Sequence, residues 1–155
     1  MDSDSLQRRL RGAFDRKVMN HGDYNLVFAQ PSGSATPYVI GYRRAPRELV
    51  LCPVDVQRRD LAQATGADDI VVVDFHNVAT VTDTGSGYQV ESVTGFRTWF
   101  EVSPATTVHV GPLSDSGMAR LDQGEDAEDF HRFMSEFMDE LDDLYPDLDM
   151  AEKSC

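Results

Sequence analysis

The sequence has no apolar segment long enough to cross a lipid bilayer. Nowhere in its 155 residues is there a run close to the ~18 consecutive apolar residues that a membrane-spanning helix needs. The opening stretch, MDSDSLQRRLRGAF, lacks the apolar centre of a secretory signal. We therefore expect a cytoplasmic protein without integral membrane association.

Cysteine and histidine are scarce as well, which weighs against a metal centre. The only cysteines are Cys52, which follows apolar residues and is expected to be a small buried hydrophobe, and the terminal Cys155. We expect no disulfide between them. None of the four histidines has the spacing of a zinc-binding pair. The prediction is a protein without metal or cofactor.

Motifs of catalysis are also missing. The sequence contains no glycine-rich phosphate loop and no nucleophile-elbow pattern. Asp74 and His76 would suit a hydrolase together with a serine, and that alternative requires a pocket around both residues. We predict that the protein is not an enzyme.

Positive charge is in short supply, and the excess of acid is local. The formal net charge is −13, and residues 125–149 hold eleven Asp and Glu against one Arg. This segment should repel nucleic acid and anionic membranes, so protein is the partner class that we expect. The length predicts one domain over 1–145, followed by a flexible acidic tail over 146–155.

The sequence is rich in strand patterns between Asp68 and Val110. From Phe96 to Val102, apolar residues and Thr98 alternate with Arg97, Trp99 and Glu101, which is typical of a strand with one buried face. Seven strands are predicted in all, over 24–30, 38–43, 48–53, 70–82, 88–93, 97–102 and 106–110. Residues 111–124 have the composition of a polar loop.

Three helices are predicted, over 4–19, 55–65 and 125–144. The last carries a continuous apolar stripe that should be buried and that stops before Pro146. Its members are Phe130, Phe133, Met134, Phe137, Met138, Leu141 and Leu144. The fold class that follows is α+β: a curved antiparallel sheet or partly open barrel of about seven strands, capped by the C-terminal helix.

Two sets of residues are candidates for binding. Trp99, flanked by Arg97, is an interface anchor if its side of the strand is wet, and it belongs to the core if the sheet curls or a helix covers that side. Arg43, Arg44 and Arg47 crowd one predicted hairpin tip. They would hold a phosphate or carboxylate there, or else extend into solvent.

The order of elements resembles the pleckstrin-homology and GRAM-like superfold, in which one C-terminal helix plugs a bent antiparallel sheet. The segment PYVIGYRRAPRELVLCPVD is similar to its paired second and third strands, and EDFHRFMSEFMDEL to its closing helix. The resemblance implies a scaffold for binding protein or ligand. Residues 30–36 contain no Lys or Arg, unlike the corresponding loop of phosphoinositide-binding members, so lipid binding is not carried over.

A second resemblance leads to a different function. A helix, three strands and a helix over the first 66 residues are similar to type III secretion chaperones, which are dimers that hold an unfolded client segment. The five short runs between 70 and 110 exceed that pattern. The first hypothesis is thus a non-catalytic cytosolic binding or adaptor module, and the alternative is a chaperone-like homodimer.

Overall fold

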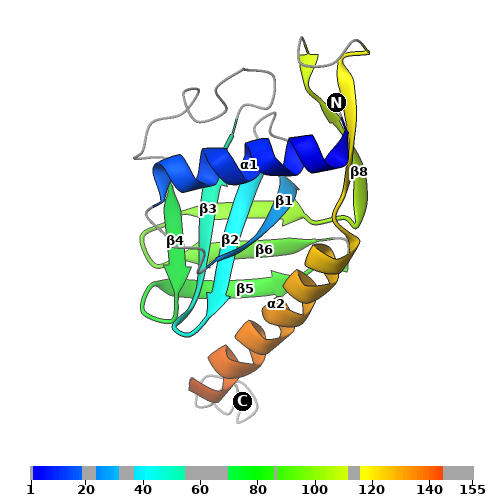
Figure 1. Cartoon of the computed structure of the whole chain (residues 1–155). Helices are drawn as coiled ribbons and strands as arrows, with labels where there is room; N and C mark the ends of the chain where they lie inside the picture. Colours follow the sequence, from blue (N-terminus) through cyan, green and yellow to red (C-terminus); the bar gives the residue numbers. More distant parts are fainter. Residues whose placement is uncertain are drawn as a thin grey trace.

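The computed structural model describes residues 2–18, 24–31, 37–54, 70–85, 87–111 and 116–144. Within these ranges the chain is an α+β protein, in which a curved and nearly closed antiparallel sheet carries one helix outside and another in its opening (Figure 1). The predicted fold class is confirmed. The helix predicted over 55–65 and the tail predicted over 146–155 lie outside the described residues.

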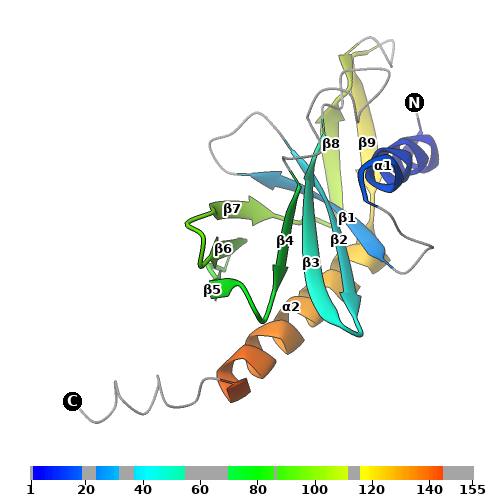
Figure 2. The same cartoon turned by 90° about the vertical axis from the view of Figure 1, so that its left-hand side faces the viewer.

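The sheet is built from two lobes that meet at one corner. Its strands are β1 (Asn25–Pro31), β2 (Tyr38–Arg44), β3 (Arg47–Pro53), β4 (Val71–Asp74), β5 (Val78–Asp83), β6 (Tyr88–Ser92) and β7 (Arg97–Glu101). They are ordered β4-β3-β2-β1-β7-β6-β5, with every neighbouring pair antiparallel. β1 pairs with β2 from Asn25 to Ala29 but with β7 only at Gln30 and Pro31. The lobes β1–β4 and β5–β7 therefore diverge from that corner (Figure 2).

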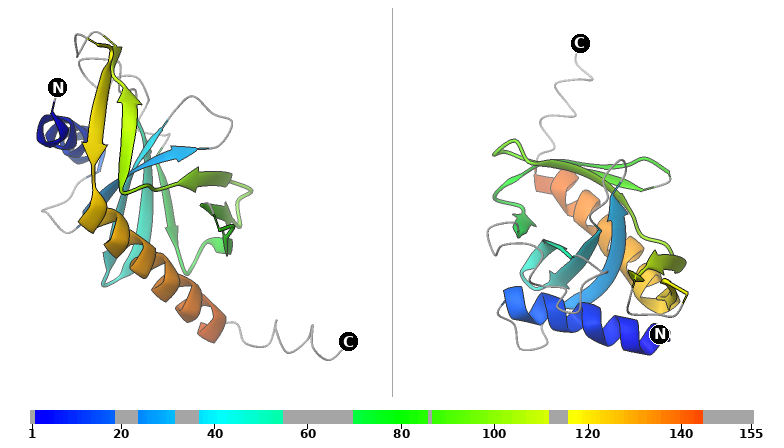
Figure 3. Two further views of the ribbon diagram at one scale, coloured as in Figure 1. Left: turned by 90° about the vertical axis from the view of Figure 1, so that its right-hand side faces the viewer. Right: turned by 90° about the horizontal axis from the view of Figure 1, so that it is seen from above.

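Helix α2 (Gly124–Leu144) fills the space between the two lobes (Figure 3). Its apolar stripe faces the inward side chains of both lobes, and each such burial contributes about 1.5–3 kcal/mol before entropy costs. The buried members are Ala127, Phe130, Phe133, Met134 and Phe137. The stripe ends earlier than predicted: Leu144 is 56% exposed because the helix runs past the strands there (Figure 1).

Helix α1 (Ser3–Lys17) covers the outer face of the β1–β4 lobe. Its N-terminus is capped by Asp2, whose carboxylate accepts a hydrogen bond from the Ser5 N–H. The ring of Phe14 lies over Gly41 of β2, where a Cβ atom would come within 2.3 Å of Phe14 Cζ. A glycine at this position lets the helix approach the sheet.

The strand predicted over 70–82 is in fact two strands. Residues 75–77 form a turn, and β4 and β5 on either side of it lie at opposite ends of the sheet order. Side-chain hydrogen bonds make the turn: Asn77 Oδ1 accepts from the Asp74 N–H at 2.9 Å, and Asn77 Nδ2 donates to Val72 O at 2.7 Å. The two edge strands are therefore neighbours along the chain.

The prediction of a loop over 111–124 is also wrong in part, because this range contains a strand. β8 (Ala105–His109) pairs with β9 (Met118–Asp122) in a separate two-stranded sheet that projects beyond the body (Figure 1). The strand predicted at 106–110 thus does not belong to the seven-stranded sheet. Val108, Ala119 and Leu121 pack with α1 in a second core cluster on the outside of the β1–β4 lobe.

Candidate functional site

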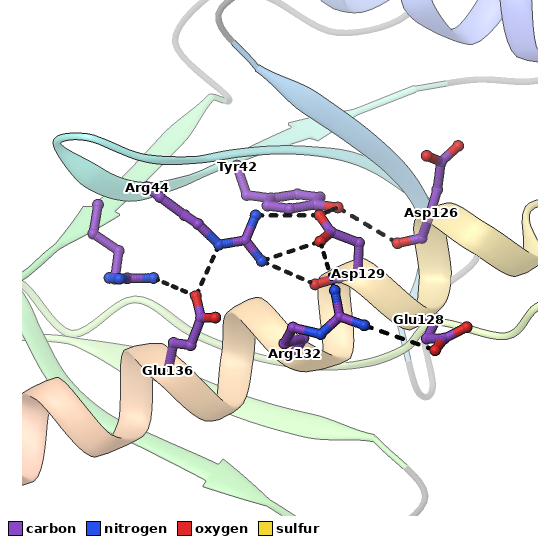
Figure 4. A network of polar contacts seen from close by, with 8 residues as sticks. Tyr42, Arg44, Asp126, Glu128, Asp129, Arg132 and Glu136 are labelled. Atoms are coloured by element: carbon purple, nitrogen blue, oxygen red, sulfur yellow. Dashed lines mark hydrogen bonds and ion pairs between the residues drawn. The ribbon is translucent and has the colours of Figure 1, made fainter.

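Two of the three arginines at the tip of the β2–β3 hairpin, Arg44 and Arg47, contact helix α2, and Figure 4 shows Arg44 among its partners. Arg44 Nε donates to Glu136 Oε1 at 2.8 Å, and Arg44 Nη2 lies 3.2 Å from Asp129 Oδ1. Arg47 Nη1 reaches Glu136 Oε1 at 2.9 Å, and Arg47 Nη2 reaches Glu140 Oε1 at 2.8 Å. The hairpin tip is therefore joined to the helix by a chain of charge-assisted hydrogen bonds.

These contacts determine how the carboxylates of α2 titrate. Burial opposes the ionisation of Asp129, but hydrogen bonds from Arg44 and Tyr42 outweigh it and lower the pKa of Asp129. Hydrogen bonds from Arg44 and Arg47 lower the pKa of Glu136. Burial and the neighbouring Asp129 carboxylate raise the pKa of Tyr42, which keeps its hydroxyl a donor.

The third arginine, Arg43, points away from this network. Its Nη2 lies 3.0 Å from Glu48 Oε1, and its guanidinium carbon is 4.8 Å from the centre of the Tyr24 ring. Of the two alternatives for the arginine cluster, extension into solvent is therefore wrong, and contact with carboxylates is found within the protein. Arg43, Arg44 and Arg47 do bind carboxylates, but those of the protein itself, so they neither form a vacant anion site nor extend freely into solvent.

Trp99 lies on the outward face of β7. The predicted alternation is confirmed, because Thr98 and Phe100 are buried whereas Trp99 is only partly buried and Arg97 is exposed. Trp99 belongs to neither apolar core cluster. Its indole Nε1 donates to Thr84 Oγ1 at 3.1 Å. The prediction that Trp99 is part of the core is therefore wrong.

The surroundings of Trp99 form an open sheet face. Cross-strand pairing places Thr82, Gln89 and Trp99 in one row, and Thr80, Glu91 and Arg97 in the next. Arg97 pairs with Glu91 across this face. Neither described helix lies on it, since α1 covers the other lobe and α2 lies between the lobes (Figure 3). We call this surface the Trp99 face.

A histidine and a tyrosine are paired at the rim of the core. His131 Nε2 is 3.1 Å from Val102 O, which can only accept, so Nε2 carries a proton and donates. Tyr88 Oη and His131 Nδ1 form a second hydrogen bond of 2.7 Å. Burial, with a contribution from Asp83, raises the pKa of Tyr88 to about 12. This pair anchors α2 to β6.

Asp74 and His76, the residues proposed for the alternative hydrolase, lie at the turn between β4 and β5 and stabilise it. Asp74 Oδ1 accepts a hydrogen bond from the His76 backbone N–H at 2.8 Å, and His76 itself is exposed. The contact is that of an Asx turn, in which the carboxylate holds the backbone. That the protein is not an enzyme stays a prediction.

One pocket of mixed character lies at the junction of α1, β1, β2, β9 and α2, with a volume of about 70 Å³. Arg11 and Asp126 stand on its rim, and Phe28, Val39 and Leu121 line its apolar part. Sequence reasoning missed it because its residues come from five separate elements.

The described residues contain no group of three His, Cys, Asp or Glu side chains placed to hold a metal ion. Of the helices in the described ranges, none is long and apolar enough to span a membrane. No protein-family model matches the sequence, and a comparison with curated proteins gives no match.

Proposed function

We propose that this chain is a non-catalytic binding module that recognises a protein partner through the Trp99 face. The observation that carries the proposal is the position of the chain's single tryptophan, partly exposed on the outward face of β7, which neither described helix covers. Tryptophan and arginine are enriched among the residues that contribute most to protein interfaces, and here Arg97 lies beside the ring. The polar residues around them suit the rim of such an interface.

The architecture supports the same class of function. A curved antiparallel sheet with a C-terminal helix in its opening is consistent with the proposed resemblance to the pleckstrin-homology and GRAM-like superfold, whose members serve as scaffolds for binding. The arginine cluster, which would be the obvious site for a phosphorylated ligand, is occupied by the protein's own carboxylates, those of α2 at Arg44 and Arg47 and that of Glu48 at Arg43. This favours a protein over a phosphate-bearing ligand, and a cytosolic adaptor is the role that we propose.

The test compares capture of partners by wild type and by two variants. Immobilised wild-type protein, Trp99→Ala and Val93→Ala are incubated with lysate of the source cells, and the retained proteins are identified by mass spectrometry. Val93 is a matched control because it is 66% exposed, apolar and lies at the turn that follows β6, outside the Trp99 rows. We expect proteins that wild type and Val93→Ala retain and Trp99→Ala does not.

A captured candidate is then titrated into wild type while the fluorescence of Trp99 is recorded. Since the chain has one tryptophan, a shift of its emission reports directly on this face. Retention of the same proteins by Trp99→Ala would contradict the proposal. A concentration-dependent dimer in sedimentation, with Trp99 buried in it, would favour the chaperone-like homodimer instead.

A further inference from the structure

The pocket between α1 and α2 has the features of a small-molecule site. Its volume of about 70 Å³ is several times the ~10–15 Å³ that one water molecule requires. Its apolar wall is fixed, because Phe28, Val39 and Leu121 are 4%, 1% and 1% exposed and belong to one core cluster. The pocket therefore pairs a rigid apolar floor with a polar rim.

Gln123 holds one side of the pocket and uses its whole amide to do so. Its Oε1 accepts from the Phe28 N–H at 2.9 Å, and its Nε2 donates to Phe28 O at 3.0 Å and to Ser103 O at 2.9 Å. Gln7, also on the pocket wall, donates from Nε2 to Asp122 O. Both glutamine amides are thus engaged by the protein itself.

The backbone of β1 also faces this pocket. Phe28 turns its N–H and C=O away from β2, toward Gln123, and alternate residues of a regular antiparallel strand face the same side. Leu26, two residues earlier and on the pocket wall, therefore presents its N–H and C=O there. In the described part of the chain, β7 joins this edge only at Gln30 and Pro31, so no described strand pairs with Leu26 on that side.

Two opposite charges complete the rim. Arg11 and Asp126 both line the pocket, and the arginine lowers the pKa of Asp126, which burial raises overall. Among the described residues, neither side chain has a hydrogen-bond partner or an ion-pair partner within 4 Å. An arginine and a carboxylate that flank one cavity without closing on each other leave both charges available to a ligand.

We propose that this pocket binds a small apolar amino acid or a close analogue in its zwitterionic form. The ligand's carboxylate accepts from Arg11 and the Leu26 N–H, its ammonium group donates to Asp126 and the Leu26 C=O, and its side chain rests on Phe28, Val39 and Leu121. This site is separate from the Trp99 face and does not depend on the function proposed there.

The experiment titrates L-valine into the full-length protein and follows backbone amide signals by NMR. Three matched compounds accompany it: isovalerate, which lacks the ammonium group, isobutylamine, which lacks the carboxylate, and isobutanol, which lacks both charges. We expect valine to shift the signals of Leu26 and its neighbours. We also expect it to bind at least about tenfold more tightly than either singly charged compound, since each loses one charged contact.

Charge-removing variants assign the effect to the two rim residues. Arg11→Gln and Asp126→Asn should each weaken valine binding to the level of the corresponding singly charged compound. Arg8→Gln and Glu125→Gln make the same charge changes on the same helices, outside the pocket wall, and should bind valine as wild type does. Circular dichroism confirms that all four variants are folded.

Three outcomes would overturn the proposal. These are equal affinities for valine and isobutanol, unchanged valine binding in Arg11→Gln or Asp126→Asn, and no signal shifts near Leu26 at any soluble valine concentration. The Trp99→Ala variant should bind valine normally. Loss of partner capture with retained valine binding would therefore separate the two sites, and the converse would do so as well.

Discussion

Two charged regions of this molecule look alike in composition and differ in what their charges do. At the hairpin tip, Arg44 and Arg47 are bound to three carboxylates of α2. At the pocket, Arg11 and Asp126 share a rim without contact. The charges of the first region are paired and hold the helix against the sheet, whereas those of the second region remain accessible to a ligand. A conspicuous cluster of arginines is thus no guide to where a ligand binds.

The largest loss of stability should come from truncating Phe133, the buried ring on which two arginines of the hairpin tip pack. Phe133 is fully buried, packs against Tyr42 at 4.9 Å between ring centres, and lies under both Arg44 and Arg47. We expect Phe133→Ala to lower the free energy of unfolding by about 3–5 kcal/mol, measured by urea denaturation. Val93→Ala, at an exposed site, should change it by less than about 0.5 kcal/mol. Equal effects would mean that α2 is not the core of this fold.

The next effect concerns the ionic part of the same region. Arg47→Met keeps most of the apolar stem of a side chain that is only 15% exposed, and it removes both contacts to Glu136 and Glu140. We expect a loss of about 1–2 kcal/mol in urea denaturation, because two carboxylates lose charge-assisted partners. An unchanged stability would show that the network is a consequence of helix docking and contributes nothing to it.

Added salt should have a smaller effect on stability, and this effect should be confined to the ion pairs of the hairpin tip. Screening weakens partly exposed ion pairs, so the stability difference between wild type and Arg47→Met should narrow as sodium chloride rises from low to about 1 M. Thermal melting of both proteins across this range provides the measurement. The difference should persist unchanged in salt if apolar packing of the Arg47 stem is its true cause.

The pKa values of two carboxylates of α2, Asp126 and Asp129, should be shifted in opposite directions from the ordinary aspartate value. The folded pKa of Asp129 is lowered, so its contribution to stability is present above its unfolded pKa and is lost as the pH falls through the folded value. The folded pKa of Asp126 is raised, so its contribution is present below its unfolded pKa and is lost as the pH rises through the folded value. NMR titration of the side-chain carboxyl carbons should place Asp126 above and Asp129 below the ordinary aspartate range. The reverse order would contradict the comparison.

The smallest effect on the free energy of unfolding is expected for Arg11, which shares the pocket rim with Asp126 without forming an ion pair with it. Arg11→Gln removes a charge that has no ion-pair partner among the described residues, so its effect on the free energy of unfolding should stay within about 0.5 kcal/mol. Urea denaturation beside Arg47→Met gives the direct contrast. A loss as large as that of Arg47→Met would mean that Arg11 is a structural residue and that its charge is not free for a ligand.

Much of the fold could be predicted because local patterns and tertiary packing agree. The stripe from Phe130 to Phe137 has helical spacing and is buried as one surface. The alternation around Trp99 predicts both its strand and its outward direction. In each case, one periodicity determines which side chains are buried.

The failures have a physical cause as well. The turn at 75–77 contains no glycine or proline and is made by the side chains of Asp74 and Asn77, so the apolar run around it looks continuous. β9 alternates buried Ala119 and Leu121 with exposed residues, but the pattern is short and follows a polar segment. The pocket could not be predicted, because Arg11 and Asp126 meet only through the tertiary arrangement of both helices.

The turn between β4 and β5 is the covalent connection between the two edge strands of the sheet. Among the described residues, no strand pairing joins the two ends of the sheet order, and the three residues of the turn connect them instead. Phe75 in that turn stacks on Phe137 of α2, with ring centres 4.7 Å apart. Cleaving the chain at His76 would therefore remove the covalent connection between the two edge strands, and the hydrogen bonds of Asn77 to Asp74 and Val72 would remain to hold them, together with the packing of Phe75 on α2.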